Sequence, residues 1–408
     1  MNGYAITMNA CKKQENKSQK IYLDNATTSF PKPEQVYLAV EKFMRTCGGS
    51  AGRSGHYAAI ESQQIIDDAR LLCAKLFNAP SPQNIVFTHN ATNAVNIALK
   101  GILSPNDHVI TGSFEHNSVT RPLYYLSQNG IIVTKIKSDL DAGLDKEQLK
   151  LAIRPDTKLV ICNHVSNVFG TANDIGGIGQ ICRDSGVLFM VDAAQSAGAK
   201  IIDVQKMSID LLAFSGHKSL FGLQGTGGLY IGSGIRIRPL IHGGSGGGGG
   251  VIGGVNLSES LEQPDNLPNS LESGTLNCHG IAGLAAGIRF ILETGIEKIM
   301  AKETELVEYL IAGLQEVNGI NVITPLKNYN RGAAVAFQHN AIPPEQIAAI
   351  LDAGFGIAVR SGLHCAADPH KIIGTINSGG AVRISPNYFN SINEIKHCIN
   401  AIKKITEL

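Results

Sequence analysis

Long hydrophobic runs are absent from this sequence of 408 residues. No stretch reaches the roughly 18 uninterrupted apolar residues of a membrane-spanning helix, and the first residues lack the apolar core of a secretory signal. An excess of one charge is absent too, because 35 Lys and Arg residues against 34 Asp and Glu residues leave a formal charge of +1. No global field would attract nucleic acid or an anionic membrane. We therefore expect a cytoplasmic protein with a small, locally charged ligand.

Paired cysteines are also lacking. The eight cysteines are scattered and show neither CxxC nor CxxH spacing. This pattern argues against a disulfide framework and against a structural zinc site. We predict that most of the cysteines are reduced and buried, and we expect no metal.

Short β-type runs alternate with helical patterns from residue 21 onwards, after a lysine-containing segment over 1–20 that predicts an N-terminal tail. Continuous apolar strands between helices predict an α/β fold, with a mainly parallel sheet between layers of helices. Ligands of such sheets bind at the carboxyl ends of the strands. The runs are Ile85–Thr88, His108–Thr111, Ile131–Thr134, Leu159–Cys162 and Leu188–Asp192.

The pattern becomes more helical beyond about residue 276, where a stripe of apolar residues from Leu306 to Leu314 has the spacing of a helix. Strand-like runs follow at 334–337, 357–360 and 381–384, and a helical pattern covers 393–408. We expect a large domain over 21–275 and a smaller α+β domain over 276–408.

Two polar residues that follow apolar runs suit one cofactor, pyridoxal phosphate (PLP). At Asp192, a carboxylate can keep a pyridine nitrogen protonated, although an isolated strand-final Asp is better explained as a helix cap. Lys218 follows the run 211–214, where a desolvated amine can form a Schiff base. A lone lysine in a loop is ordinarily solvated surface. The presence of Asp192 at a neighbouring strand end favours Lys218 as the lysine that binds PLP.

Other strand ends carry groups that suit the same cofactor. Ser215 and His217 could hold a phosphate beside Lys218. Residues 90–93 lead into a helical pattern, whose free N–H groups and dipole favour a phosphate, but a plain helix cap explains them as well. His116 could lie flat on a cofactor ring. On the residues alone its role stays open.

Seven segments, in this order, resemble the class V, fold-type I PLP enzymes, and specifically the cysteine desulfurases and selenocysteine lyases. The similarity starts at Tyr22-Leu23-Asp24-Asn25-Ala26 and covers nearly the whole chain after the tail. It implies a fold-type I transferase that forms a homodimer. The segments are Glu115-His116, His164-Val165-Ser166-Asn167, Asp192-Ala193-Ala194-Gln195, Ser215-Gly216-His217-Lys218, Glu272-Ser273-Gly274-Thr275, Arg360-Ser361-Gly362-Leu363-His364-Cys365 and Arg383.

The resemblance implies a role for each matched residue. His116 stacks on the pyridine ring, Asp192 pairs with its nitrogen, and Gln195 and Asn167 contact the ring hydroxyl or the substrate. Arg383 grips the substrate α-carboxylate with a bidentate fork, and Arg53 approaches the site from the partner subunit. The implied phosphate ligands are Ala91, Thr92, Ser215, His217 and, from a second subunit, Thr275.

Cys365 is implied to be the nucleophile that takes sulfur from the substrate, with Lys218 and His116 as the other catalytic residues. Arg360, which is also implied in substrate binding, or His364 could stabilise its thiolate. The other cysteines are better explained as small buried hydrophobes. The implied reaction converts L-cysteine to L-alanine and leaves a persulfide on the enzyme, from which a sulfur-acceptor protein could be served, as in iron–sulfur cluster assembly.

Three alternatives stay open at this point. A selenocysteine lyase would use the same cofactor chemistry on L-selenocysteine and depend less on Cys365. Another class V reaction, such as transamination or racemisation, would make Cys365 incidental. A catalytically inactive scaffold protein of a sulfur-transfer complex is disfavoured, because Lys218, Asp192 and Cys365 are all present.

A glycine-rich stretch over 243–254 departs from the family pattern, since nine of its twelve residues are glycine. It follows a strand that we expect at Arg238–His242. Such a stretch has great backbone freedom and little to pack. It is equally well interpreted as a mobile flap that admits a sulfur acceptor and as a disordered surface insertion.

Overall fold

The computed structural model describes residues 20–52, 55–244, 251–252, 255–256, 261–327 and 331–407. The expected tail, Arg53 and most of the glycine-rich stretch lie outside these residues. In that stretch, β11 (Val251–Ile252) pairs antiparallel with β12 (Val255–Asn256), which directly follows the stretch. The tail and the flap therefore stay predictions.

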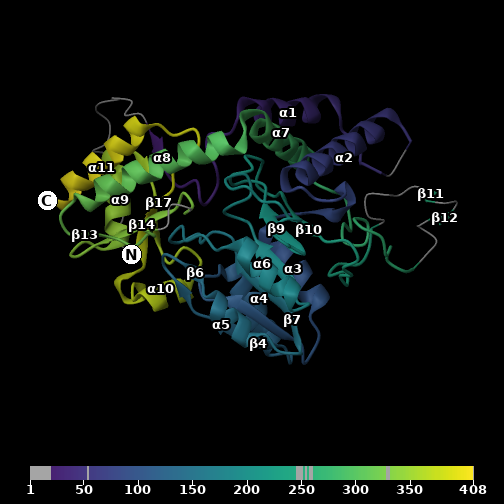
Figure 1. Ribbon diagram of the computed structural model, residues 1–408. Coiled ribbons are helices and arrows are strands. Elements are labelled where there is room, and N and C mark those ends of the chain that lie inside the picture. Colours follow the sequence, from purple (N-terminus) through teal and green to yellow (C-terminus); the bar gives the residue numbers. More distant parts are fainter. Residues whose placement is uncertain are drawn as a thin grey trace, which may run out of the picture.

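A seven-stranded sheet forms the centre of the larger part of the molecule (Figure 1). Its strands are all parallel except β10, which runs antiparallel to both of its neighbours. The prediction of a mainly parallel sheet is confirmed, whereas the antiparallel strand was not predicted. Across the sheet the order is β2 (Ile85–Thr88), β10 (Gly227–Ile231), β9 (Leu211–Ser215), β8 (Leu188–Asp192), β7 (Thr157–Asn163), β3 (His108–Gly112) and β4 (Ile132–Ile136).

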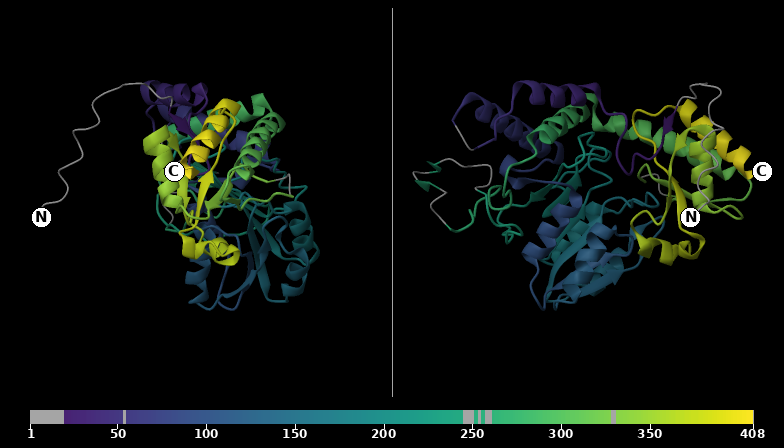
Figure 2. Two further views of the ribbon diagram at one scale, coloured as in Figure 1. Left: turned by 90° about the vertical axis from the view of Figure 1, so that its left-hand side faces the viewer. Right: turned by 180° about the vertical axis from the view of Figure 1, so that it is seen from behind.

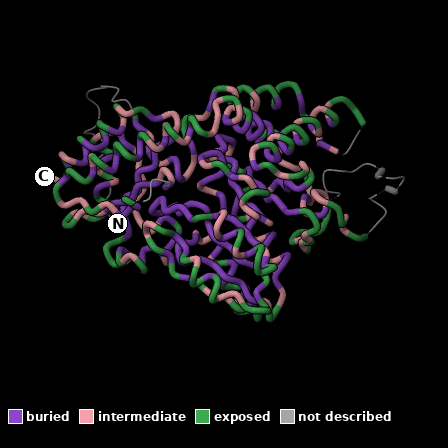
Figure 3. Tube along the Cα trace, viewed as in Figure 1, coloured by how far each residue is buried: buried purple, intermediate pink, exposed green. Residues whose placement is uncertain are grey.

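Helices cover both faces of this sheet because successive side chains of a strand point to opposite faces. In β2, Val86 packs with α3 (Ala91–Ile102) and α4 (Asn117–Ser127), whereas Ile85 and Phe87 pack on the opposite face. Figure 3 shows the buried residues concentrated between these layers. The helices of the second face are α2 (Tyr57–Phe77), α5 (Lys146–Ala152), α6 (Ile175–Asp184) and α7 (Cys278–Thr294), with α1 (Glu34–Thr46) packed on α7.

The C-terminal elements gather at one side of the molecule, and α8 (Ile296–Gln315) runs from the end of α7 towards them (Figures 1 and 2). The predicted stripe from Leu306 to Leu314 is buried, which confirms the helix. A four-stranded antiparallel sheet lies under α8, α9 (Pro344–Phe355) and α11 (Ile392–Thr406). Its order is β13 (Ile320–Val322), β14 (Val335–His339), β17 (Ala381–Ile384) and β16 (Arg360–Gly362).

The beginning of the described chain belongs to the C-terminal packing. Strand β1 (Ile21–Tyr22) pairs parallel with β15 (Ile357–Ala358), and Leu23 packs with α8 and α11. In contrast, apolar residues of α7 pack with the large sheet. The expected division at residue 276 stays a prediction. The short elements are η1 (Pro82–Asn84), β5 (Ser138–Asp139), β6 (Gly143–Leu144), α10 (Ala367–Ile373) and η3 (Ile376–Ser378). None of the described helices is long and apolar enough to cross a membrane.

The expected strand at Arg238–His242 is absent from the described structure. Pro239 has no N–H to give to a sheet. The N–H of Arg238 instead donates to the carbonyl of Gly101, and its guanidinium donates to the carbonyl of Leu103 at 2.5 Å. The segment is therefore held against the end of α3 rather than against a strand.

A buried ion pair joins α2 to the segment before α7. Arg70 lies 2.8 and 2.9 Å from the two carboxylate oxygens of Glu272, and the side chains are 6% and 1% exposed. One of these oxygens also accepts the N–H of Phe87 at 2.6 Å. The pair therefore ties β2, α2 and the loop that carries Thr275 together.

Glu272→Gln should lower the free energy of unfolding by about 3 kcal/mol, because it leaves Arg70 charged and buried without its counter-ion. Urea denaturation measures the loss. The double variant Arg70→Met with Glu272→Met should lose less than the single variant. A single variant that loses no more than the double variant would contradict this account.

Candidate active site

A cavity of about 270 Å³ opens at the carboxyl ends of the parallel strands β2, β3, β7, β8 and β9. This is where a parallel sheet binds its ligands, because the loops after neighbouring strands meet at one edge. Nine of the predicted site residues line it, although they come from five separate segments of the chain. They are Ala91, Thr92, His116, Asn167, Asp192, Gln195, Ser215, His217 and Lys218.

Asp192 and His116 are joined through a serine that the sequence interpretation left without a role. The hydroxyl of Ser118 donates to Asp192 Oδ2 at 3.3 Å and lies 2.8 Å from His116 Nδ1. His116 caps α4 by accepting the N–H of Ser118 at 2.9 Å. Burial lowers the pKa of His116 to about 4, so its ring is neutral at pH 7. The carboxylate and a neutral, oriented imidazole therefore face the same cavity.

Lys218 follows β9 in a tight turn. Gly216 begins the turn by donating its N–H to the carbonyl of Thr226, and a Cβ at Gly216 would lie only 2.2 Å from the Thr226 hydroxyl. Burial, together with the nearby Arg383 and Arg360, lowers the pKa of Lys218 to about 8 against the opposing charge of Asp192. The amine is thus much easier to deprotonate than an exposed lysine.

The N-terminus of α3 meets the turn after β9 at one end of the cavity. Asn90 caps α3 by accepting the N–H of Asn93 at 2.9 Å, and the N–H of Ala91 donates to the Ser215 hydroxyl at 3.2 Å. His217 Nδ1 is buried and has no partner among the described residues. The dipole of α3 and this unpaired ring nitrogen favour an anion at this end.

The groups around the cavity fit PLP. The amine of Lys218 suits an aldehyde, the carboxylate of Asp192 suits a pyridine nitrogen, and the end beside α3 suits a phosphate. Asn167 Oδ1 is also buried without a partner among the described residues, which leaves an acceptor for a hydroxyl of a ligand.

Arg383 lies on β17, does not line this cavity and is 1% exposed. Its guanidinium donates to the carbonyl of Asn167 at 2.8 Å, to Asp24 Oδ1 at 2.7 Å and to the Thr27 hydroxyl at 3.0 Å. Its Nε is buried and has no partner among the described residues. Asp24 and Thr27 were missed as site residues, and Asp24 entered the sequence interpretation only as part of a family marker.

Cys365 lies in the loop between β16 and α10 and is exposed, whereas the six other cysteines of the described chain are buried. Two backbone carbonyls of this loop accept hydrogen bonds from residues of the larger part of the molecule. Cys365 accepts the N–H of Asn117 at 2.9 Å, and His364 accepts the side-chain amide of Asn167 at 2.6 Å. Both loop residues have positive φ, 58° and 51°, which ordinary side chains rarely adopt. These bonds therefore fix the backbone that carries the thiol.

Of the two groups expected near the thiol, Arg360 contacts it. Arg360 Nη2 lies 3.2 Å from Cys365 Sγ. His364 instead stacks on His370 at a centroid distance of 5.7 Å, and burial lowers the pKa of His364 to about 2. A neutral imidazole adds no positive charge next to the sulfur.

Thr275 is not brought to this cavity. It lines a separate hollow with Thr88, His89 and Asn93. Its expected contact comes from a second subunit, and that contact stays a prediction.

Comparisons with known proteins agree with the fold and the cavity. The family model "Aminotransferase class-V" matches residues 21–398. A protein named "Probable cysteine desulfurase" from Methanothermobacter thermautotrophicus is 34% identical over 379 residues, covering 92% of each chain. Cysteine desulfurase IscS from Dictyoglomus turgidum is 28% identical over 403 residues, covering 95% of each.

Solved structures give the same result. The cysteine desulfurase from Thermococcus onnurineus superposes with a TM-score of 0.87 at 32% identity, and the cysteine desulfurase CsdA from Escherichia coli with a TM-score of 0.83 at 27% identity. Each covers 95% of both chains. The chain therefore belongs to the aminotransferase class-V family of PLP-dependent enzymes, among the cysteine desulfurases.

Proposed function

We propose that this protein is a PLP-dependent cysteine desulfurase that converts L-cysteine to L-alanine and keeps the sulfur on Cys365. One observation carries the proposal. The only exposed cysteine of the described chain follows His364, whose carbonyl accepts the side-chain amide of Asn167 in the cavity wall, and its sulfur lies 3.2 Å from a guanidinium. A class V enzyme that did not use a thiol would not need this arrangement.

The cavity residues would hold the cofactor at four points. Lys218 would bind the aldehyde carbon, Asp192 the ring nitrogen, His116 the ring face, and residues 91–92 with Ser215 and His217 the phosphate. Asn167 and Gln195 would contact the ring hydroxyl or the substrate. Bound PLP supplies an electron sink that stabilises negative charge at the substrate Cα.

The chain's own groups then move protons and sulfur. Lys218 Nζ, with a pKa of about 8, takes the proton from the substrate Cα and returns it later. The thiolate of Cys365 attacks the substrate sulfur, so that an S–S bond forms and the Cβ–S bond breaks. The electron pair of the broken bond and the former S–H proton end on Cβ, which becomes the methyl group of alanine. Arg360 favours the attacking anion, and Arg383 holds the α-carboxylate.

The proposal also includes a substrate, a sulfur acceptor and a second subunit. L-Cysteine is the proposed substrate, and the exposed Cys365 would pass its sulfur to an acceptor protein. A homodimer would bring Thr275 to the phosphate of the other subunit's site. Size measurement in solution tests the dimer, and loss of bound PLP from Thr275→Val tests the shared phosphate site.

Mass spectrometry of the purified protein after incubation with L-cysteine tests the function. We expect one added sulfur on the peptide that contains Cys365, with one L-alanine formed for each sulfur removed from the substrate. 3-Mercaptopyruvate or D-cysteine as the product, with no added sulfur, would refute the assignment and point to transamination or racemisation.

The rate at which the cofactor-free protein binds PLP should rise with pH. Because the lowered pKa of Lys218 is about 8, raising the pH from 7 to 8 increases the neutral amine. The rate of PLP binding should rise about fivefold over this interval and level off above pH 9. Stopped-flow absorbance measures it. 4-Deoxypyridoxine phosphate, which has no aldehyde, should bind without this rise; a flat profile for PLP itself would contradict the pKa shift.

A further inference from the structure

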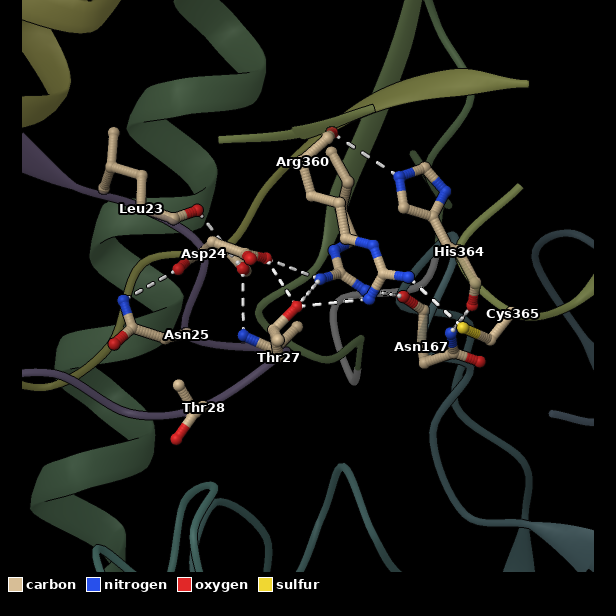
Figure 4. Close-up of polar contacts among 12 residues, drawn as sticks. Leu23, Asp24, Asn25, Thr27, Thr28, Asn167, Arg360, His364 and Cys365 are labelled. Atoms are coloured by element: carbon tan, nitrogen blue, oxygen red, sulfur yellow. Dashed lines mark hydrogen bonds and ion pairs between the residues drawn. The ribbon is translucent and has the colours of Figure 1, made fainter. Parts of the chain in front are cut away.

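The hydroxyl of Thr27 lies where two arginines meet. It accepts from Arg383 Nη2 at 3.0 Å and from Arg360 Nη1 at 3.3 Å, and it donates its own proton to Asp24 Oδ1 at 2.9 Å (Figure 4). A hydroxyl has one donor and two acceptor positions, so all of its capacity is used. Among the described residues, no other side chain is hydrogen-bonded to both guanidiniums.

Asp24 fixes the direction of this hydroxyl and supplies the negative charge. Its carboxylate lies 2.7 Å from Arg383, and the side chain is 18% exposed. Without it, Arg383 and Arg360 would be two cations that face one hydroxyl, with like charges in a poorly solvated place. Because Asp24 Oδ1 accepts the hydroxyl proton, the lone pairs of Thr27 are directed at the arginines.

Each arginine leads to a different part of the proposed reaction. Arg383 contacts the carbonyl of Asn167 and is the proposed holder of the substrate carboxylate. Arg360 contacts Cys365 Sγ at 3.2 Å. Thr27 thus connects the position of the substrate with the position of the attacking thiol.

We propose that Thr27, oriented by Asp24, is a positioning residue that sets the two guanidiniums relative to each other, and so sets the distance between substrate sulfur and thiol. This inference rests on the proposed function and deepens it. A near-attack geometry is sensitive to small displacements, and a shared hydrogen bond restricts both arginines at once. Serine can make the same three bonds, whereas valine keeps the shape of threonine but makes none of them.

The test compares Thr27→Val with Thr27→Ser in the holoenzyme. We expect Thr27→Val to raise KM for L-cysteine about tenfold, the loss typical of one hydrogen bond to a charged group. The same variant should slow the alkylation of Cys365 by iodoacetamide at pH 7.5 about threefold, because an unanchored Arg360 stabilises the thiolate less. Peptide mass spectrometry assigns the label to Cys365. Thr27→Ser should stay within twofold of the unmodified enzyme in both measurements.

Cysteamine separates positioning from general damage, since it has the amine and thiol of cysteine but no carboxylate. Its affinity, measured by absorbance titration, should change less than twofold in Thr27→Val. Thr46→Val, which removes an exposed hydroxyl on α1, serves as the matched control. Asp24→Asn should raise KM in the same direction as Thr27→Val.

Two results would overturn the proposal. One is a Thr27→Val enzyme whose KM and alkylation rate both equal those of Thr27→Ser. The other is an equal loss for L-cysteine and cysteamine, which indicates a general structural fault. An unmodified enzyme that forms no alanine would refute the proposed function. The alkylation measurement needs no turnover, so it would still test the positioning role of Thr27 in that case.

Discussion

Cys365→Ala is expected to lower the turnover of L-cysteine at least about a hundredfold, because the reaction loses the atom that receives the sulfur. The cofactor site should be unaffected, since Cys365 does not line the cavity and the substitution keeps the backbone bond from Asn117 to its carbonyl. We therefore expect unchanged bound PLP and an unchanged KD for L-alanine, with loss confined to kcat. Alanine formation measured by chromatography, beside the absorbance of the bound cofactor, checks both parts.

Cys182→Ala is the matched control, because Cys182 is buried in α6 and does not line the cavity. Its turnover should equal that of the unmodified enzyme. L-Selenocysteine provides a second comparison, since selenide leaves more readily than sulfide and needs the thiol less. High turnover of L-cysteine by Cys365→Ala would refute the persulfide step.

Lys218→Ala is expected to abolish the near-visible absorbance of lysine-bound PLP and to lower turnover by about a thousandfold or more, since one residue both binds the cofactor and transfers the Cα proton. Lys218→Arg should behave alike, because a guanidinium neither reacts with the aldehyde nor gives up its proton at pH 7. Ultraviolet–visible spectra and alanine assays measure the two losses.

Lys206→Ala is the control for this pair of variants, since the Lys206 side chain is 85% exposed and pairs only with Asp203. It should keep the spectrum and the rate. A Lys218→Ala protein that retained the absorbance band would show that another amine holds the cofactor. The assignment of Lys218 would then be wrong.

Signals at strand ends predicted most of the cavity. Asp192 and Lys218 each follow a buried apolar run, and a parallel sheet brings such loops to one edge whatever their separation in the chain. The rule needs only local patterns, and these are visible in one sequence. The same patterns predicted the parallel strands within a few residues, as at β8, where the predicted and observed ranges coincide.

The missed features depend on contacts that no local pattern encodes. Asp24 and Arg383 are 359 residues apart, and neither flanking sequence contains a sign of the other. Ser118 acts through one bond to Asp192, 74 residues away, and its position resembles an ordinary helix start. Strand β10 was missed because its direction is set by pairing with β2 and β9 rather than by its own residues.

The pairing of β1 with β15 has a consequence for how the enzyme is made. The first described strand finds its sheet partner only at Ile357 and Ala358, near the end of the sequence, and the bond from Arg383 to Asp24 closes the same long loop. Contacts of such high sequence separation form late, because the chain must lose much entropy before they stabilise it. A growing polypeptide can build the large sheet early. The arginine network must wait until residue 383 has been synthesised, so an unfinished chain cannot hold its substrate.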